Sequence, residues 1–225
     1  MISSLGVKAV TLDLDGTLLD TIPDLAAAAN AMLDELGRPR LTTAQVGSYV
    51  GKGIPNLVAR CLSQPGQPPA ADLDQAIGLF RRHYAVSNGR ATVVYPGVRE
   101  GLDRLRALAL PLGCVTNKAA AFTEPLLEMV GLREYFAIVV SGDTLPEKKP
   151  HPLPLLHIFA HFGVAPADAL HIGDSINDVQ AARAAGCRVF VVPYGYNEGE
   201  DVSGLDCDAI VGSLEAAARL LARAI

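Results

Sequence analysis

Two aspartates, Asp13 and Asp15, stand two residues apart in Asp13-Leu14-Asp15-Gly16-Thr17, directly after an apolar run. Side chains alternate along an extended strand, so the two carboxylates point the same way. Like charges at such a distance repel by about 4 kcal/mol at an effective dielectric constant near 20. A cation, a shared proton or solvent would relieve that repulsion, and Mg²⁺ prefers oxygen ligands. The pair therefore predicts a metal or acid–base site, with a solvated acidic turn at Gly16 as the alternative.

Polar side chains also follow three other predicted strands, at the point where each strand ends. They are Thr116 and Asn117, then Lys149, and finally Asp174 with Asp178. Taken singly, Thr116 could cap a helix, and Asp178 could be an acidic residue of the first helical turn that interacts favourably with the helix dipole. Together, four carboxylates and one ammonium sum to about −3, which Mg²⁺ and one protonated aspartate would bring to about zero. Such a site could accept a phosphoryl group.

These residues require strands and helices that bring the strand ends together. Short apolar runs predict buried strands at 7–12, 110–115, 137–140, 169–172, 188–192 and 209–211. Helical patterns lie between or after them at 98–108, 122–130, 152–162, 177–185 and 214–224. The alternation predicts an α/β fold with a Rossmann-like parallel sheet covered by helices on both faces. Ligands of such sheets bind beyond the carboxyl ends of the strands.

A different pattern occupies residues 18–94, where no convincing strand is found between about 18 and 95. Helices are predicted at 22–36, with Thr21 as its cap, and at 54–62 and 73–86. A loop rich in proline, glycine and polar residues separates the last two at 63–69. We expect a Rossmann-like catalytic core of residues 1–17 and 95–225, with residues 18–94 inserted as an all-helical cap.

Composition limits the classes of partner and location. With a net charge of −5 over 225 residues and no long basic block, nucleic-acid binding is unsupported. No apolar run approaches the roughly 20 residues of a membrane span, and residues 1–6 lack a secretory pattern. The four scattered cysteines predict neither zinc binding nor disulfides and fit a reducing cytoplasm.

In this order and spacing, Asp-x-Asp-Gly-Thr, the strand-end Thr-Asn, Lys-Pro-x-Pro and Gly-Asp-Ser-x-x-Asp resemble the motifs of the haloacid dehalogenase-like superfamily. The resemblance spans the chain and implies a Mg²⁺-dependent phosphatase that forms an aspartyl-phosphate. Segments 49–53, 171–175 and 193–199 are similar to members that hydrolyse 2-phosphoglycolate. The implied partner is therefore a small phosphate monoester, acted on by a monomer or a homodimer.

The resemblance also implies roles for the carboxylates. Asp13 would be the nucleophile and a metal ligand. Asp15 would be the general acid/base, with its backbone carbonyl on the metal. Asp174 would be a metal ligand, and Asp178 an outer carboxylate that orients metal-bound water or Lys149.

The phosphoryl oxygens would be bound by Thr116 and Lys149, with Asn117 in support. Lys149 is preferred to its neighbour Lys148 because it directly precedes Pro150.

In the cap, Gly51-Lys52-Gly53 precedes the helix predicted at 54–62 and resembles a loop whose N–H groups receive an anion. We expect Gly51, Lys52 and Gly53 to bind the far carboxylate of the substrate. An ordinary turn with glycines at positive φ is the alternative.

Other reactions of the superfamily fit less well. Dehalogenation needs no aspartate at position 15, and phosphonate hydrolysis uses an alanine there together with a cap lysine, for which Lys52 would be the candidate. A β-phosphoglucomutase-like phosphotransferase would carry a histidine in the first cap helix, where residues 24–27 have none. A binding module without activity would usually have lost one of the motif residues. Sugar phosphates, nucleotides and pyrophosphate remain open as substrates.

Overall fold

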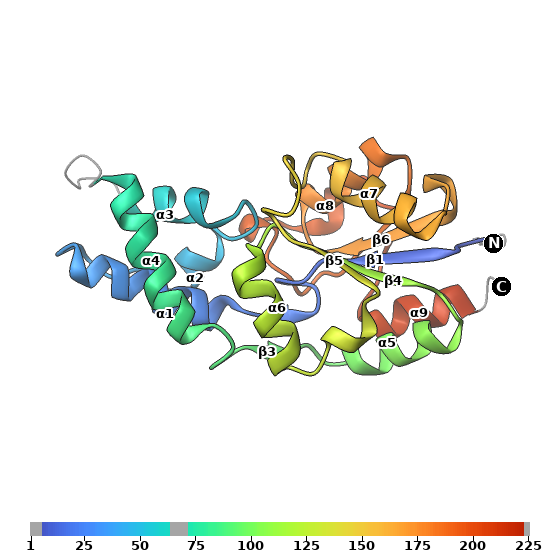
Figure 1. The fold of residues 1–225 in the computed structure, drawn as a ribbon, viewed down its shortest axis with the longest axis horizontal. Helices are drawn as coiled ribbons and strands as arrows, with labels where there is room; N and C mark the ends of the chain where they lie inside the picture. The colour runs from blue at the N-terminus through green and yellow to red at the C-terminus, as the bar shows by residue number, and fades with distance from the viewer. Residues whose placement is uncertain (1–5, 64–71, 223–225) are drawn as a thin grey trace.

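A six-stranded parallel sheet forms the centre of the molecule (Figure 1). The computed structural model describes residues 6–63 and 72–222. Across the sheet the strands are β5 (Ile138–Val140), β4 (Leu112–Val115), β1 (Ala9–Leu12), β6 (Ala169–Gly173), β7 (Arg188–Val191) and β8 (Ala209–Ile210). The predicted α/β fold with a Rossmann-like parallel sheet is confirmed.

Helices cover both faces of this sheet. One face packs against α5 (Val98–Ala107), α6 (Ala120–Met129) and α9 (Leu214–Ala222), and the other against α7 (Leu153–Phe162) and α8 (Ile176–Ala185). Figure 1 shows α5 and α9 on the side of the sheet opposite α7 and α8. Alternation along β1 sends Val10 and Leu12 into the first core, while Thr11 meets His171 of β6 on the other side.

A separate group of helices lies beyond the carboxyl ends of the strands (Figure 1). It contains α1 (Ile22–Glu35), α2 (Thr43–Gly47), α3 (Ile54–Leu62) and α4 (Leu73–Ser87). These helices bury a hydrophobic cluster of their own that includes Phe80 and Tyr84. The short helix α2 was not predicted, although a capping box between Thr42 and Gln45 marks its start. Beyond Ser63, the predicted loop at 63–69 lies outside the described residues.

A two-stranded antiparallel ribbon joins the cap to the core. It pairs β2 (Leu19–Asp20) with β3 (Val93–Val94). The expectation of no strand between about 18 and 95 is therefore wrong at both ends, because a two-residue strand leaves no periodic pattern in the sequence. The ribbon lies beside both expected domain boundaries, which themselves stay a prediction.

The remaining regular elements are short. Among the described residues, four 3₁₀ turns occur, at Arg133–Tyr135, Pro166–Asp168, Asn197–Gly199 and Val202–Gly204. Every helix within the described ranges is too short or too polar to cross a lipid bilayer. Cys61, Cys114, Cys187 and Cys207 are all free thiols, and the first three are buried.

Candidate active site

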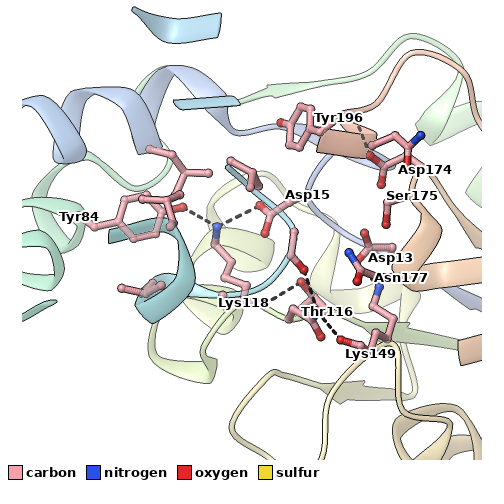
Figure 2. Close-up of a pocket in the computed structure, with 18 residues that line it drawn as sticks. Asp13, Asp15, Tyr84, Thr116, Lys118, Lys149, Asp174, Ser175, Asn177 and Tyr196 are labelled. Atoms are coloured by element: carbon pink, nitrogen blue, oxygen red, sulfur yellow. Dashed lines mark hydrogen bonds and ion pairs between the residues drawn. The ribbon is translucent and has the colours of Figure 1, made fainter. Parts of the chain in front are cut away.

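A pocket lies between the strand ends and the cap, and Figure 2 shows the side chains that line it. Asp13 and Asp15 enter it from the segment after β1, which the sheet holds in place because Asp13 N–H donates to the carbonyl of Ile172 at 2.9 Å. Gly16 follows with a φ of +90°, and a Cβ there would overlap the carboxylate of Asp174. Glycine at position 16 therefore lets the two loops approach closely.

Lys149 lies between two of the predicted carboxylates. Its Nζ is 2.6 Å from Oδ1 of Asp13 and 2.6 Å from Oδ1 of Asp178, and the residue is only 3% exposed. Burial lowers the pKa of Lys149, but the charges of both aspartates outweigh burial and hold that pKa above its usual value. The neighbouring Lys148 instead donates to the backbone carbonyl of Lys52 at 2.9 Å.

Asp178 is fully buried, and both of its carboxylate oxygens accept hydrogen bonds. Oδ1 accepts hydrogen bonds from the ammonium of Lys149 and from Nε2 of His171, the latter at 3.0 Å. Oδ2 accepts from the backbone N–H of Ser175 at 3.0 Å and from its hydroxyl at 2.7 Å. Burial raises the pKa of Asp178, but Lys149 and His171 outweigh it and hold that pKa below its usual value. Asp178 thus caps the start of α8 and also holds the ammonium of Lys149 in position.

Asp174 faces Asp13 across the cluster. Its Oδ1 accepts from the Thr17 hydroxyl at 3.0 Å and its Oδ2 from the Tyr196 backbone N–H at 2.6 Å. Burial, with the charge of Asp178, raises the pKa of Asp174 to about 7. Burial also raises the pKa of Asp13 well above its usual value, against the opposing effect of Lys149.

The donor set of this cluster suits a hard divalent cation. One carboxylate oxygen each of Asp13, Asp174 and Asp178 lie within 4.8 Å of one another. Each oxygen of Asp178 accepts two or more hydrogen bonds, one of them from the ammonium of Lys149, whereas each oxygen of Asp174 accepts one. Asp13 and Asp174 are therefore the carboxylates best able to contact an ion. Both have raised pKa values, as expected for buried carboxylates whose negative charge a cation would balance.

The predicted phosphoryl-binding residues also line the pocket. The hydroxyl of Thr116 is buried at the end of β4 and accepts from the backbone N–H of Lys118 at 3.1 Å. Asn117 donates from its Nδ2 to the carbonyls of Gly51 and Lys149, both at 2.8 Å. Asn117 therefore ties the cap loop to the loop that carries Lys149.

The predicted cap loop is divided between pocket and surface. Gly51 and Gly53 line the pocket, and Gly53 begins α3 with a φ of +84°. Lys52 is not among the pocket-lining residues, and its ammonium pairs with Glu198 of the core. The substrate contact expected of Lys52 stays a prediction.

Three residues of the site were missed by sequence reasoning. The ammonium of Lys118 pairs with Oδ1 of Asp15 at 3.0 Å and donates to the hydroxyl of Tyr84 (Figure 2). Thr21, expected to cap α1, makes no side-chain capping bond and instead donates to the same Asp15 oxygen at 2.7 Å. The one available signal was the position of Lys118, directly after Thr116 and Asn117 at a strand end.

A fourth missed residue is Asn177 at the start of α8. It is 3% exposed and lines the pocket, and its Nδ2 lacks a hydrogen-bond partner within the described part of the chain. A buried amide donor without a partner is costly, so this group is suited to bind a ligand in the pocket.

A family model for the haloacid dehalogenase-like hydrolases matches residues 10–192, and the chain belongs to that family. A protein of Nitrosospira multiformis named phosphoglycolate phosphatase is 58% identical over 219 residues, covering 96% of each chain. One of the same name from Thiobacillus denitrificans is 51% identical over 222 residues, covering 98% of each. The solved structure of a predicted phosphoglycolate phosphatase from Haemophilus somnus 129pt is similar with a TM-score of 0.88 at 31% identity, covering 96% of this chain and 98% of that one.

Proposed function

We propose that the protein is a phosphatase that hydrolyses a small phosphate monoester, 2-phosphoglycolate, to glycolate and phosphate. The observation that carries this proposal is the pairing of two aspartates after β1 with two different lysines. Asp13 contacts Lys149, and Asp15 contacts Lys118. One carboxylate is thus suited to attack phosphorus and the other to transfer a proton. The names of relatives 58% and 51% identical to this chain support the same substrate.

Mg²⁺ is the cofactor that we propose, held by Asp13, Asp174 and the backbone carbonyl of Asp15. When bound, it supplies positive charge that balances the carboxylates and polarises the phosphoryl group. The oxygen-only donor set and the raised pKa values of Asp13 and Asp174 support this assignment. Asp178 is then not itself a metal ligand but positions Lys149, with whose ammonium it already pairs.

In the first half of the reaction, a carboxylate oxygen of Asp13 attacks phosphorus and forms an aspartyl-phosphate. The bond from phosphorus to the bridging oxygen breaks, and Asp15 gives that oxygen a proton as glycolate leaves. The described hydrogen bonds to the Asp15 carboxylate end on Oδ1, which leaves Oδ2 for this proton. Lys149 and Thr116 bind the phosphoryl oxygens, with Asn117 holding the loop of Lys149.

In the second half, Asp15 takes a proton from water as the water oxygen attacks phosphorus. The bond to Asp13 breaks, which frees its carboxylate and releases inorganic phosphate. The sum is one ester and one water converted to one alcohol and one phosphate. The same Asp15 serves as acid and then as base, as a two-step hydrolysis requires.

The test is a substrate panel assayed with Mg²⁺. Phosphoglycolate, sugar phosphates, nucleotides and pyrophosphate are compared by kcat/KM, and rapid quenching with labelled substrate locates the phosphoryl group. We expect the highest kcat/KM for phosphoglycolate and label on Asp13. A higher value for a sugar phosphate or a nucleotide would contradict the substrate, and label absent from Asp13 would contradict the covalent route.

A further inference from the structure

Lys118 is a buried cation of the pocket to which the steps above give no role. The residue is 7% exposed, and its backbone is held by hydrogen bonds to Thr116 and from Gly142. Burial lowers the pKa of Lys118, but Asp15 and Tyr84 outweigh it and hold that pKa above its usual value. The ammonium therefore stays charged at neutral pH, at the boundary between core and cap.

Two lysines line the described pocket, and their surroundings differ. Lys149 lies against Asp13 and Asp178, where the phosphoryl group is expected. Lys118 points away from that pair toward Tyr84 of α4 in the cap (Figure 2). The described contacts of its ammonium use two N–H bonds, to Asp15 and Tyr84, out of the three that an ammonium carries.

The contact with Asp15 places Lys118 within reach of the leaving group. Asp15 must be within hydrogen-bond distance of the bridging oxygen to protonate it. In phosphoglycolate, the carboxylate carbon is only two covalent bonds from that oxygen. A cation 3.0 Å from Oδ1 of Asp15 is therefore close to the substrate carboxylate whenever the bridging oxygen is close to Asp15.

We propose that Lys118, together with the hydroxyl of Tyr84, binds the carboxylate of the substrate and so determines specificity, an inference that rests on the proposed phosphatase function. Tyr84 accepts a hydrogen bond from Lys118, so its own O–H is available to a carboxylate oxygen. Burial raises the pKa of Tyr84 to about 12, which keeps that proton in place at neutral pH. One core residue and one cap residue thus form the subsite.

Apolar cap residues also line the pocket. Leu25, Val50 and Leu57 line it and are themselves buried. Low polarity strengthens the attraction between Lys118 and a carboxylate, because fewer waters screen the charges. The same side chains leave little to hydrogen-bond the hydroxyls of a sugar, which favours a short, carboxylate-bearing leaving group.

The test compares phosphoglycolate with 2-hydroxyethyl phosphate, which has nearly the same shape but no carboxylate. The wild type should favour phosphoglycolate in kcat/KM. Lys118→Gln should reduce that preference at least about tenfold, as expected for the loss of a charge-assisted contact. It should also weaken inhibition by glycolate while inhibition by inorganic phosphate is kept. Tyr84→Phe should give a smaller loss of the same kind.

Lys148→Gln is the matched control, since it makes the same change at a nearby lysine that lies outside the pocket lining and donates to the backbone carbonyl of Lys52. It should leave the preference unchanged. Equal losses on both substrates in Lys118→Gln, with glycolate inhibition kept, would overturn the inference and leave Lys118 as a positioning residue for Asp15. A wild type without preference for phosphoglycolate would instead contradict the proposed function, and this inference with it.

Discussion

The buried ammonium of Lys149 donates a hydrogen bond of 2.6 Å to Asp178, a carboxylate with no exposed surface. The same carboxylate oxygen contacts His171, and its second oxygen holds the start of α8. Asp178 therefore links the lysine that we assign to phosphoryl binding with the segment that carries Asp174. A single substitution at this position would affect both stability and the geometry of the site.

We predict that Asp178→Asn lowers the free energy of unfolding by about 3–5 kcal/mol, because it removes one partner of a buried ion pair. The pKa of Asp178 is lowered in the folded state, so its contribution is present above the unfolded pKa of about 3.9 and is lost as pH falls toward the folded pKa. Urea unfolding at pH 7 and pH 3 should show a smaller gap between wild type and variant at the lower pH.

Asp168→Asn is the control for this measurement. Asp168 pairs with Lys8 at 2.8 Å, but both side chains are more than one-third exposed. Exposed pairs contribute little to stability, so Asp168→Asn should lower the free energy of unfolding much less than Asp178→Asn does. Similar losses in the two variants would argue against a special contribution from the buried pair.

The fold could be predicted from local patterns because each strand of the sheet is a short apolar run followed by a polar strand end. All six strands were found in order, with ends that differ by one to a few residues. The strands β2 and β3 were missed because two residues carry no periodicity, and they pair across more than 70 residues of chain. The short helix α2 was missed because five residues are too few for a helical pattern.

The site was harder to predict where a residue depends on the cap. Asp13, Asp15, Thr116, Asn117, Lys149 and Asp174 follow strands, and the structure brings them to one pocket. Lys118 was missed because a lone lysine after a strand usually lies in solvent. In the structure Lys118 is buried, and Tyr84, 34 residues earlier, packs against it. The Lys52–Glu198 pair similarly joins residues far apart in sequence.

Catalysis by the two aspartates predicts different losses for their amide variants. Asp13→Asn should abolish measurable turnover of phosphoglycolate, because the nucleophile is lost at nearly constant shape. Asp15→Asn should lower kcat by about 10²–10⁴-fold. Its loss should be smaller with p-nitrophenyl phosphate, whose leaving group needs no proton. Steady-state kinetics with both esters checks this, and an Asp15→Asn variant equally impaired on both would count against a leaving-group acid.

Removal of the metal should abolish activity. An excess of chelator should stop turnover and Mg²⁺ should restore it, while Ca²⁺, which takes more ligands in looser geometry, should support it poorly. Mg²⁺ should also raise the Tm, because binding at one hundred times its Kd adds about 2.7 kcal/mol to the free energy of unfolding. Asp174→Asn should remove most of that Tm shift. Undiminished turnover in chelator would exclude metal-assisted hydrolysis.

Gly16 offers a test of the metal site by crowding alone. In Gly16→Ala the new Cβ would overlap the carboxylate of Asp174, so Mg²⁺ affinity should fall measurably in calorimetry. Gly163→Ala is the matched control, since Gly163 also has positive φ, at +65°, but a Cβ there would meet no atom within 4 Å in the described part of the chain. Both variants should lose about 1–2 kcal/mol of stability through backbone strain, and Gly16→Ala should lose more because its Cβ also overlaps Asp174. Only Gly16→Ala should lose metal affinity.

The last prediction concerns Lys52, which the sequence suggested as a carboxylate-binding residue. In the structure its ammonium pairs with Glu198, and its side chain is 45% exposed. An exposed pair is worth roughly 0–1 kcal/mol, so Lys52→Ala should raise KM by no more than about fivefold. The increase should be equal for phosphoglycolate and 2-hydroxyethyl phosphate, because the lost contact joins cap to core and not cap to substrate. Glu198→Gln should have at least this effect, because it also removes the ion pair of Glu198 with Arg60 at 3.1 Å. High salt should reduce both differences. A rise in KM for phosphoglycolate alone would contradict this and show that Lys52 contacts the substrate carboxylate.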